Sequence, residues 1–438
     1  MTSPRSELRT CVSLFAGGGI GDLGFRRAGF HTIVLNELLD DRAQLARLNF
    51  PEAKIVVGDI WDVLDEIEFA AKEALNSLGE DELFLLSATP PCQGMSKNGI
   101  GSILKAMRDG KRSTLDHRNY LFEPALDLVN RLKPRFFLFE NVDRMANAFV
   151  LDGEGQRTEL VGLLRRQLAE LGYAGDFWPV NMADYGVPQH RRRLVGIFVR
   201  QDYATEHRIF ADSLIPEPTA SKRTTLRQAI GHLPEIDSST RDLARSKYHP
   251  LHHVPVSRPN LYKWIRCTKE GDTAFNNNRC VECEVVSARK EVQCDGCGAL
   301  LPKPVVVDAN GEARLIKGFV SAYKRMSYDE PSPTITTRSA YACSDHNLHP
   351  TQHRVLSLLE VAIIQGIRPE EYKWGPFASR IHGKSVTKFI ANDTLLRDVL
   401  GEPVPPPFSE AVANHLGNLS AGVSLPRQRL SEQLALLG

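Results

Sequence analysis

One cysteine, Cys92, lies in a stretch that could carry nucleophilic chemistry. It follows an apolar run at residues 83–86, which is typical of a buried strand, and comes directly after Pro90 and Pro91. The two prolines end this strand and stiffen the turn, because each fixes φ and removes a backbone donor. We therefore expect the thiol at the carboxyl end of a strand, where open α/β sheets place their ligands. A nucleophile is needed at such a place, although a small buried hydrophobe is the commoner fate of a lone intracellular cysteine.

Two other expected strands have charged residues at one end, an acid after the first and arginines before the second. Residues 135–139 read as a strand that ends in Glu140, and a helix-capping carboxylate is the simpler alternative for this side chain. Three consecutive arginines, Arg191 to Arg193, enter the apolar strand at residues 194–199. They cannot all point to solvent, so at least one is expected to face a cleft and to have a partner, because buried arginines are paired.

A glycine-rich loop lies between the first expected strand and the first expected helix, at residues 16–21. Strand, glycine turn and helix open a Rossmann-type unit, although turns alone explain many such loops. Glu37 ends the second strand 20 residues after Gly17, the spacing of a carboxylate on a ribose hydroxyl, and Asp59 follows the third strand. This pattern indicates a nucleoside-containing cofactor. A nucleoside triphosphate is disfavoured, since no Gly-x-x-x-x-Gly-Lys-Ser/Thr phosphate loop occurs.

Residues 93–118 are rich in glycine and cations. Such a run is commonly a solvated loop, and the functional alternative is a mobile lid that closes over an anionic polymer.

Two CxxC pairs, separated by ten residues, form the clearest metal pattern of the chain. The four candidate ligands are Cys280, Cys283, Cys294 and Cys297. Paired knuckles of this kind suit a tetrahedral zinc ribbon, which would be structural because four thiolates leave no open coordination position. The gap is shorter than usual, but a compact hairpin can bridge it.

Size and composition place these sites in an ordinary globular chain. A length of 438 residues suggests two or three domains. Near residue 201 prolines become frequent and the alternation of expected strands and helices stops, so we expect a domain boundary there. No apolar run reaches 18 residues and the start lacks a signal peptide, so we expect a cytoplasmic protein without disulfides. The net charge of +1 requires any nucleic-acid surface to be a local basic face. Farther on, residues 326–337 read as strand-like, residues 353–366 as an amphipathic helix, and residues 409–416 as a helix.

The ordered set of motifs resembles the DNA (cytosine-5) methyltransferase family of bacterial and phage type. Matching segments run from Thr10 to Leu416, with residues 201–320 and 375–400 outside the match. The motifs are Phe15-Ala16-Gly17-Gly18-Gly19, Asn36-Glu37, Gly58-Asp59-Ile60, Pro90-Pro91-Cys92-Gln93, Glu140-Asn141-Val142, Gln189-x-Arg191-x-Arg193, Pro331-Ser332-Pro333-Thr334-Ile335-Thr336 and Val404-Pro405-Pro406. The resemblance implies an α/β, Rossmann-like, S-adenosylmethionine-dependent domain at residues 1–200, completed by residues 401–438. It also implies a smaller, irregular target-recognition domain at residues 201–400, into which the ribbon at residues 280–297 is inserted.

The resemblance also implies a mechanism. A target cytosine is flipped out of the duplex, Cys92 adds to its carbon 6, and carbon 5 then takes a methyl group from S-adenosylmethionine. Glu140 would donate to ring nitrogen 3, and Arg193 would hold the exocyclic oxygen. Arg191 would support the thiolate and its loop, and Gln189 belongs to the same motif. The expected cofactor residues are Phe15, Ala16, Gly17, Gly18, Gly19, Glu37, Asp59, Ile60, Pro91, Leu121, Glu402 and Val404.

Glu402 departs from the family pattern, which usually has Gly-Asn before Val-Pro. A shifted alignment or a solvent-facing side chain would explain it. The alternative is a carboxylate beside the sulfonium, which would alter the preferred methyl donor.

Double-stranded DNA is the expected partner, and a cognate restriction endonuclease is a further candidate. Monomeric action on one strand at a time is the family default, and we expect the protein to be associated with the nucleoid. The ribbon either supports the recognition domain or presents residues to a groove. Two rival hypotheses remain: an RNA cytosine methyltransferase of the tRNA-modifying branch, and a DNA-binding module with an inert catalytic domain. The large recognition region argues against the first, and the intact Cys92, Glu140, Arg191 and Arg193 argue against the second.

Overall fold

The computed structural model describes residues 8–91, 120–151, 156–317, 321–344, 346–375, 377–381, 384–388 and 392–423. Cys92, the cation-rich stretch at residues 93–118 and the segment after residue 423 lie outside these residues.

A seven-stranded sheet organises the chain, with the strand order β3-β2-β1-β4-β5-β9-β8. The first five strands in this order run parallel, and the sequence order reverses between β1 and β4, which is the topological switch point of an open α/β sheet. β9 is antiparallel to both β5 and β8. The strands are β1 (Thr10–Leu14), β2 (His31–Glu37), β3 (Lys54–Val57), β4 (Leu85–Ala88), β5 (Phe136–Val142), β8 (Tyr173–Asn181) and β9 (Arg192–Arg200). The predicted Rossmann-like α/β fold is confirmed.

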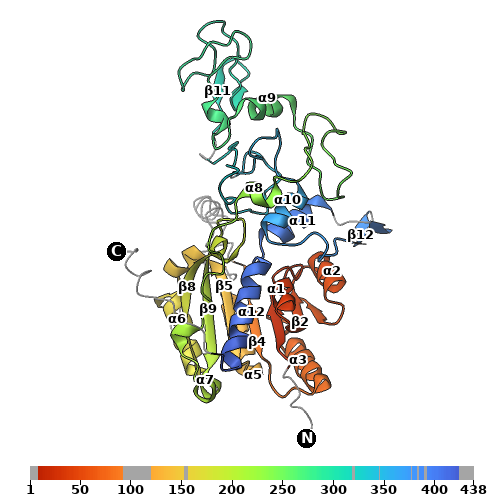
Figure 1. Cartoon of the computed structure of the whole chain (residues 1–438), viewed down its shortest axis with the longest axis vertical. Coiled ribbons are helices and arrows are strands. Elements are labelled where there is room, and N and C mark those ends of the chain that lie inside the picture. The colour runs from red at the N-terminus through yellow and green to blue at the C-terminus, as the bar shows by residue number, and fades with distance from the viewer. Residues whose placement is uncertain are drawn as a thin grey trace.

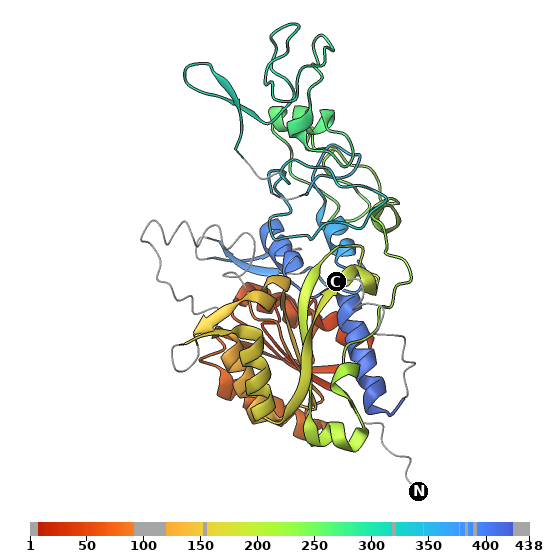
Figure 2. The same ribbon diagram turned by 90° about the vertical axis from the view of Figure 1, so that its left-hand side faces the viewer.

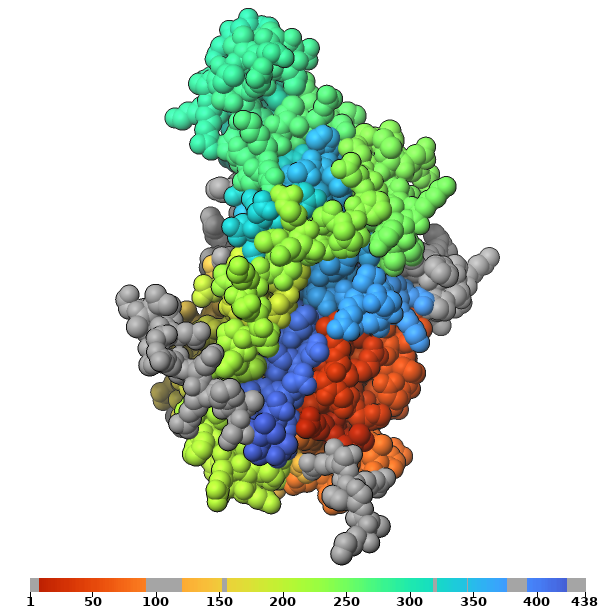
Figure 3. Space-filling view, viewed as in Figure 1, coloured from red at the N-terminus to blue at the C-terminus, as the bar shows by residue number. Residues whose placement is uncertain are grey.

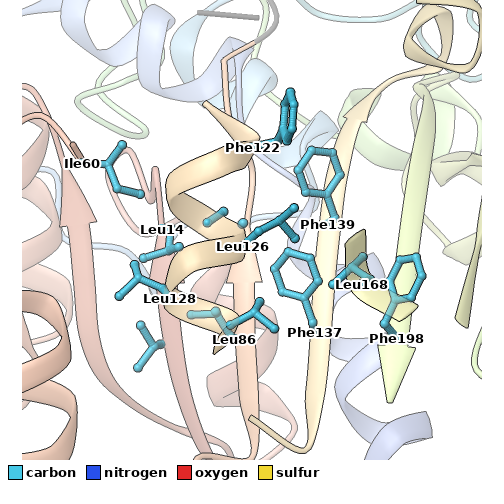
Figure 4. Packing of buried hydrophobic residues seen from close by; sticks show 14 of the residues in the cluster. Leu14, Ile60, Leu86, Phe122, Leu126, Leu128, Phe137, Phe139, Leu168 and Phe198 are labelled. Carbon is cyan, nitrogen blue, oxygen red and sulfur yellow. The ribbon is translucent and has the colours of Figure 1, made fainter. Parts of the chain in front are cut away.

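Helices cover both faces of the sheet (Figure 1). One face packs against α3 (Leu64–Leu78), α5 (Phe122–Leu132) and α6 (Leu160–Glu170). Figure 4 shows Leu126 and Leu128 of α5 lying over Leu86, Phe137 and Phe139 of the strands. The other face packs against α1 (Asp22–Arg27), α7 (Gln201–His207) and α12 (Pro406–Ser420). These strands read as continuous apolar runs because both of their faces are buried.

The C-terminal helix α12 returns to the sheet and packs on α1. The two helices approach so closely that a Cβ at Gly24 would lie 2.2 Å from the Pro406 carbonyl oxygen. Ser409 Oγ also donates a hydrogen bond to the Gly21 carbonyl oxygen at 2.6 Å. Residues beyond 200 belong to the same core, because Tyr203 and Leu214 are buried with α12.

A second, irregular region extends from the carboxyl edge of the sheet (Figures 1 and 2). Its helices are α8 (Leu226–Ile230), α9 (Pro259–Cys267), α10 (Leu358–Ile364) and α11 (Asp393–Gly401), and its strands form the hairpins β10 (Val305–Val307) with β11 (Ala313–Leu315) and β12 (Phe377–Ile381) with β13 (Lys384–Lys388). Its α8, α10 and α11 share a core with α2 (Asp40–Asn49) and Phe50. The space-filling view shows the surfaces of the two regions in contact (Figure 3). A small hairpin of β6 (Phe149–Leu151) and β7 (Arg157–Glu159) precedes α6.

Short 3-10 segments occur beside both regions. They are η2 (Asp143–Asn147), η3 (Met182–Tyr185), η4 (Ala211–Ser213) and η5 (Ala274–Asn276).

Two sequence-based expectations about local structure are wrong. Residues 326–337 form no strand, and Ser332 makes only an isolated bridge to Gln189. The helix expected from residue 353 begins at Leu358, because Ser357 and Glu360 form a capping box that fixes the start one turn later.

Candidate active site

Glu140 and Arg193 meet across the antiparallel pair β5 and β9. Glu140 is opposite Val195 in this ladder, so Arg193, two residues earlier on β9, lies on the same face as Glu140. Arg193 Nε is 2.9 Å from Glu140 Oε1, and the Glu140 side chain is only 9% exposed. Burial raises the pKa of Glu140, while Arg193 and Arg191 partly oppose the rise. The site therefore holds a carboxyl group that retains its proton to higher pH than usual, next to a fixed cation.

Asn141 and Thr89 hold the turn that leads to Cys92. The Asn141 amide donates to the Pro90 carbonyl oxygen at 3.2 Å, which ties the turn to the end of β5. On the other side, Thr89 Oγ1 donates to the Phe15 carbonyl oxygen at 3.3 Å. The Pro90–Pro91 turn thus lies between Glu140 and the glycine-rich loop. Cys92 itself lies outside the described residues.

Arg191 and Gln189 contact the second region. Arg191 is 1% exposed and donates to the carbonyl oxygens of Ile335, at 3.2 Å, and of Gly401 and Glu402, at 3.2 and 2.7 Å. Gln189 accepts from the Ile335 amide at 3.0 Å and donates to Gln365 Oε1 at 3.1 Å. Both side chains fasten the start of β9 to residues that follow it by more than a hundred positions. A catalytic role for either one stays a prediction, whereas the expectation that a buried arginine has partners is confirmed.

The glycine-rich loop has the backbone that its sequence predicts. Phe15, Gly17 and Gly19 all have positive φ, at 58°, 58° and 74°. The Gly17 amide donates to Glu37 Oε2 at 2.9 Å, so the loop and the acid that ends β2 are joined directly. A Cβ at Gly17 would meet nothing within 4 Å, whereas one at Gly18 would lie 2.6 Å from Tyr372 Oη. Gly17 therefore faces open space, and Gly18 is required by packing.

The remaining expected cofactor residues fall into two groups. Ala16 and Leu121 are half-buried, and Pro91 and Asp59 are exposed at the same edge of the sheet. Ile60 and Val404 are core residues, 2% and 7% exposed, so their side chains pack inside the protein.

The edge between the glycine loop and the end of β3 suits an adenosine group chemically. It carries two carboxylates, Glu37 and Asp59, for hydroxyl and amino groups, the open backbone at Gly17, and the exposed indole of Trp61. Sequence reasoning missed Trp61 and also Tyr372, whose hydroxyl donates to the Gly18 carbonyl oxygen at 2.7 Å. The position of Trp61 two residues after Asp59 was an available signal, while nothing in the sequence linked Tyr372 to the loop.

Glu402, expected near the cofactor, forms an ion pair with Arg42 of α2. Arg42 Nη2 lies 3.2 Å from Glu402 Oε1, and Nη1 contacts the other carboxylate oxygen. Arg42 is a further residue that sequence reasoning missed.

The four cysteines of the CxxC pairs come together. Their sulfur atoms all lie within 4.8 Å of one another. Two of the Sγ–Sγ distances, 3.4 Å between Cys283 and Cys294 and 3.6 Å between Cys280 and Cys297, are too long for disulfides. Amides of the knuckles point at sulfur, with Gly296 N 3.3 Å from Cys294 Sγ. The predicted grouping of four thiols is confirmed, and the donor set suits zinc.

Comparison with known proteins shows the family of the chain. The family model for C-5 cytosine-specific DNA methylases matches residues 9–418. The Type II methyltransferase M1.HgaI of Avibacterium volantium is 29% identical over 93% of this chain and 98% of its own length, and M.XorII of Xanthomonas oryzae pv. oryzae is 26% identical over 97% and 88%. The crystal structure of a putative DNA modification methyltransferase from an E. coli prophage has a TM-score of 0.57 at 19% identity, covering 94% of this chain and 99% of that one.

Fold and site define an α/β methyltransferase. The chain belongs to the C-5 cytosine-specific DNA methylase family and is a DNA (cytosine-5) methyltransferase. In the part of the chain that the structure describes, no helix has the length and apolar character that crossing a membrane requires.

Proposed function

We propose that this enzyme methylates carbon 5 of a cytosine flipped out of a specific duplex sequence, through a covalent adduct with Cys92. The observation that supports this most is the buried Glu140–Arg193 pair beside the turn that leads to Cys92. The bases of a duplex are stacked, so chemistry on one of them requires its extrusion into a closed pocket.

Each residue has a distinct task in the proposed reaction. The Cys92 thiolate bonds to carbon 6 while Glu140 donates to nitrogen 3, and the electron pair of the ring becomes available at carbon 5. Arg193 holds the exocyclic oxygen and keeps Glu140 in place. After methylation, a base removes the carbon-5 proton, the double bond re-forms, and Cys92 leaves. S-adenosylmethionine supplies the electrophilic methyl group when it is bound.

The cofactor would be held at the edge of β1, β2 and β3. Glu37 is proposed to bind the ribose hydroxyls and Asp59 the adenine amino group, while the open face of Gly17 lets the backbone approach closely. Phe15 lies beside this loop. Arg42 neutralises Glu402, which favours the ordinary donor over one with extra positive charge.

The four cysteines are proposed to bind one structural zinc ion. The irregular region from α8 to α11, with this ribbon, would form the target-recognition domain. The sheet and the helices that cover it, α7 and α12 included, would form the catalytic domain, so the boundary lies later than the expected residue 201. We propose a monomer that acts on DNA in the cytoplasm near the nucleoid. Several of the similar proteins are Type II methyltransferases, so a cognate restriction endonuclease is a proposed partner.

The test is transfer of tritiated methyl from S-adenosylmethionine to duplex DNA and to tRNA, for wild type and for Cys92→Ala. Label at carbon 5 of DNA cytosine that is lost in the variant is the expected result. Label in tRNA alone would favour the RNA-modifying branch, and no label in either despite DNA binding would favour an inert domain or another donor.

Glu140→Gln tests the acid. The amide still donates a hydrogen bond but supplies no proton, so we expect kcat to fall by about 10²- to 10⁴-fold. Because burial raises the pKa of Glu140, the wild-type rate should fall as pH rises through that pKa and the acid form is lost. The exposed Glu170→Gln is the matched control and should retain activity. Unchanged kcat in Glu140→Gln would remove this residue from the mechanism.

A further inference from the structure

The Arg42–Glu402 ion pair joins α2 to the end of α11, and the two residues are 360 positions apart in the chain. The pair lies near Glu37, where the cofactor is proposed to bind. Arg42 lies in the first turn of α2, directly after the strand that ends in Glu37. Glu402 caps the end of α11 and precedes α12. The guanidinium contacts both carboxylate oxygens, and the Arg42 side chain is 18% exposed. A two-point contact of this kind fixes orientation as well as distance.

The backbone that presents Glu402 is held rigidly. Its carbonyl oxygen accepts from Arg191 at 2.7 Å, and Arg191 also binds the preceding carbonyl oxygen of Gly401. Gly401 packs so tightly that a Cβ there would lie 2.3 Å from the Thr337 amide nitrogen. The carboxylate therefore projects from a fixed point, and movement of α2 would have to break the ion pair.

Glu37, the proposed ribose-binding acid, is the last residue of β2, the strand that leads into α2. Glu37 holds the Gly17 amide through one oxygen and the Leu39 amide, at 2.9 Å, through the other. Arg42 interacts electrostatically with Glu402 and also with Glu37 and Asp398. Removing Arg42 would take away the cation that these three carboxylates share and leave their mutual repulsion uncompensated by it.

From this geometry we propose that the Arg42–Glu402 ion pair is a clasp that holds α2 against the end of α11 and so positions Glu37 for S-adenosylmethionine. The clasp rests on the proposed function, because it assumes that this cofactor binds at the β2 edge. Arg42 and Glu402 are positioning residues in this proposal. The carboxylate of Glu402 serves its partner arginine instead of contacting the methyl donor.

The Arg42–Glu402 pair is less exposed than an ordinary surface ion pair, since the Arg42 side chain is 18% exposed and that of Glu402 is 43% exposed. Exposed pairs contribute little, because solvent screens them and both side chains lose entropy. The same helix offers an example in Arg47 and Asp40, which lie 3.2 Å apart with side chains 45% and 68% exposed. Arg47→Gln is therefore the matched control for Arg42→Gln.

The test is calorimetric binding of S-adenosylmethionine and of S-adenosylhomocysteine to the full chain, with steady-state kinetics alongside. Arg42→Gln and Glu402→Gln should each raise the dissociation constant and the KM for S-adenosylmethionine by about tenfold, with kcat changed by less than about threefold. The charge-swapped variant Arg42→Glu/Glu402→Arg should recover most of the affinity. Arg47→Gln should bind like wild type, and matching thermal unfolding curves should show that all variants are folded.

Three results would overturn the clasp. One is unchanged affinity in Arg42→Gln. Another is lost affinity in Glu402→Gln alone, which would place Glu402 on the cofactor itself. The third is a charge-swapped variant no better than the single variants. If wild type binds neither compound, the proposed function fails instead, whatever the variants do.

Discussion

Asp22 is a buried carboxyl group beneath the glycine-rich loop, at the start of α1. It is 3% exposed, and Ser13 Oγ donates to its Oδ1 at 2.5 Å. Burial raises the pKa of Asp22 to about 7, although hydrogen bonds from Ser13 and Thr32 oppose the rise. The group is therefore largely neutral in the folded protein under conditions where the unfolded chain would carry a charge.

The free energy of unfolding should depend on pH through Asp22. Because its folded pKa lies above its ordinary value of 3.8, its contribution to stability is complete below about pH 4 and is lost as pH rises through about 7. Asp22→Asn removes this titration and keeps an acceptor for Ser13. Urea unfolding of wild type and variant from pH 4 to 8 should show the wild type losing up to about 4 kcal/mol relative to the variant. The exposed Asp81→Asn should follow the wild type, and parallel curves for Asp22→Asn and wild type would contradict this prediction.

The contacts of some site residues could be predicted from the sequence, and those of others could not. The Glu140–Arg193 contact follows from each residue's position at the end of a buried strand, once the two strands pair. Arg42 and Tyr372 could not be found in this way, because their contacts join segments that are distant in sequence and only packing brings them together. Cys92 was singled out by its chain neighbours alone.

The junction between α11 and the segment at residues 331–337 shows why an element can be misread. Its residues 334–337 are of types common in strands. However, the Ile335 amide donates to Gln189 and the Ile335 carbonyl oxygen accepts from Arg191, so these groups are not available for hydrogen bonds to a neighbouring strand. In contrast, the parallel strands and their acidic ends were predictable, because a strand buried on both faces is a local apolar run.

Gly401→Ala should loosen this junction. The new Cβ would lie 2.3 Å from the Thr337 nitrogen and 2.5 Å from the Thr336 carbonyl carbon, and the backbone there is held by Arg191. We expect a loss of about 2 to 4 kcal/mol in the free energy of unfolding, measured by urea denaturation. In α6, Gly162→Ala is the control, since its Cβ would meet only the ends of two flexible side chains, Glu159 Oε2 at 3.6 Å and Arg166 Nη1 at 3.8 Å. Helix propensity predicts a gain of up to about 1 kcal/mol for this control. If the two substitutions changed the free energy of unfolding equally, the backbone at residues 336–337 could move to accommodate the new Cβ, and the prediction would be wrong.

At the scale of the whole molecule, the ribbon is a distant but firmly attached part. It lies at the end of the second region farthest from the sheet (Figure 1). The Asn277 amide joins it to α9 by donating to the Trp264 carbonyl oxygen at 2.9 Å and to that of Pro302 at 2.7 Å. Lys303 is fully buried and donates to the carbonyl oxygens of Arg289 and Glu291.

The ribbon's own core is too small to fold unaided. Its buried apolar cluster consists of Cys280, Cys294 and Leu301, so we expect most of the free energy that orders it to come from a metal ion bound to the four thiols. The enzyme purified without chelator should therefore hold one zinc ion per chain by elemental analysis. Cys283→Ser should lose that ion, while Cys343→Ser, which changes an exposed cysteine outside the cluster, should keep it.

Loss of zinc should act locally, because the ribbon and the proposed cofactor edge lie in different regions. Limited proteolysis of Cys283→Ser should cut within residues 280–301 at enzyme concentrations that leave wild type intact, and affinity for duplex DNA should fall if the ribbon orders the recognition surface. Binding of S-adenosylmethionine should stay within about twofold of wild type, since its proposed ligands are fixed by the sheet and not by the ribbon. A zinc-free chain that resists proteolysis as well as wild type would show that Asn277 and Lys303 suffice to order the ribbon without metal.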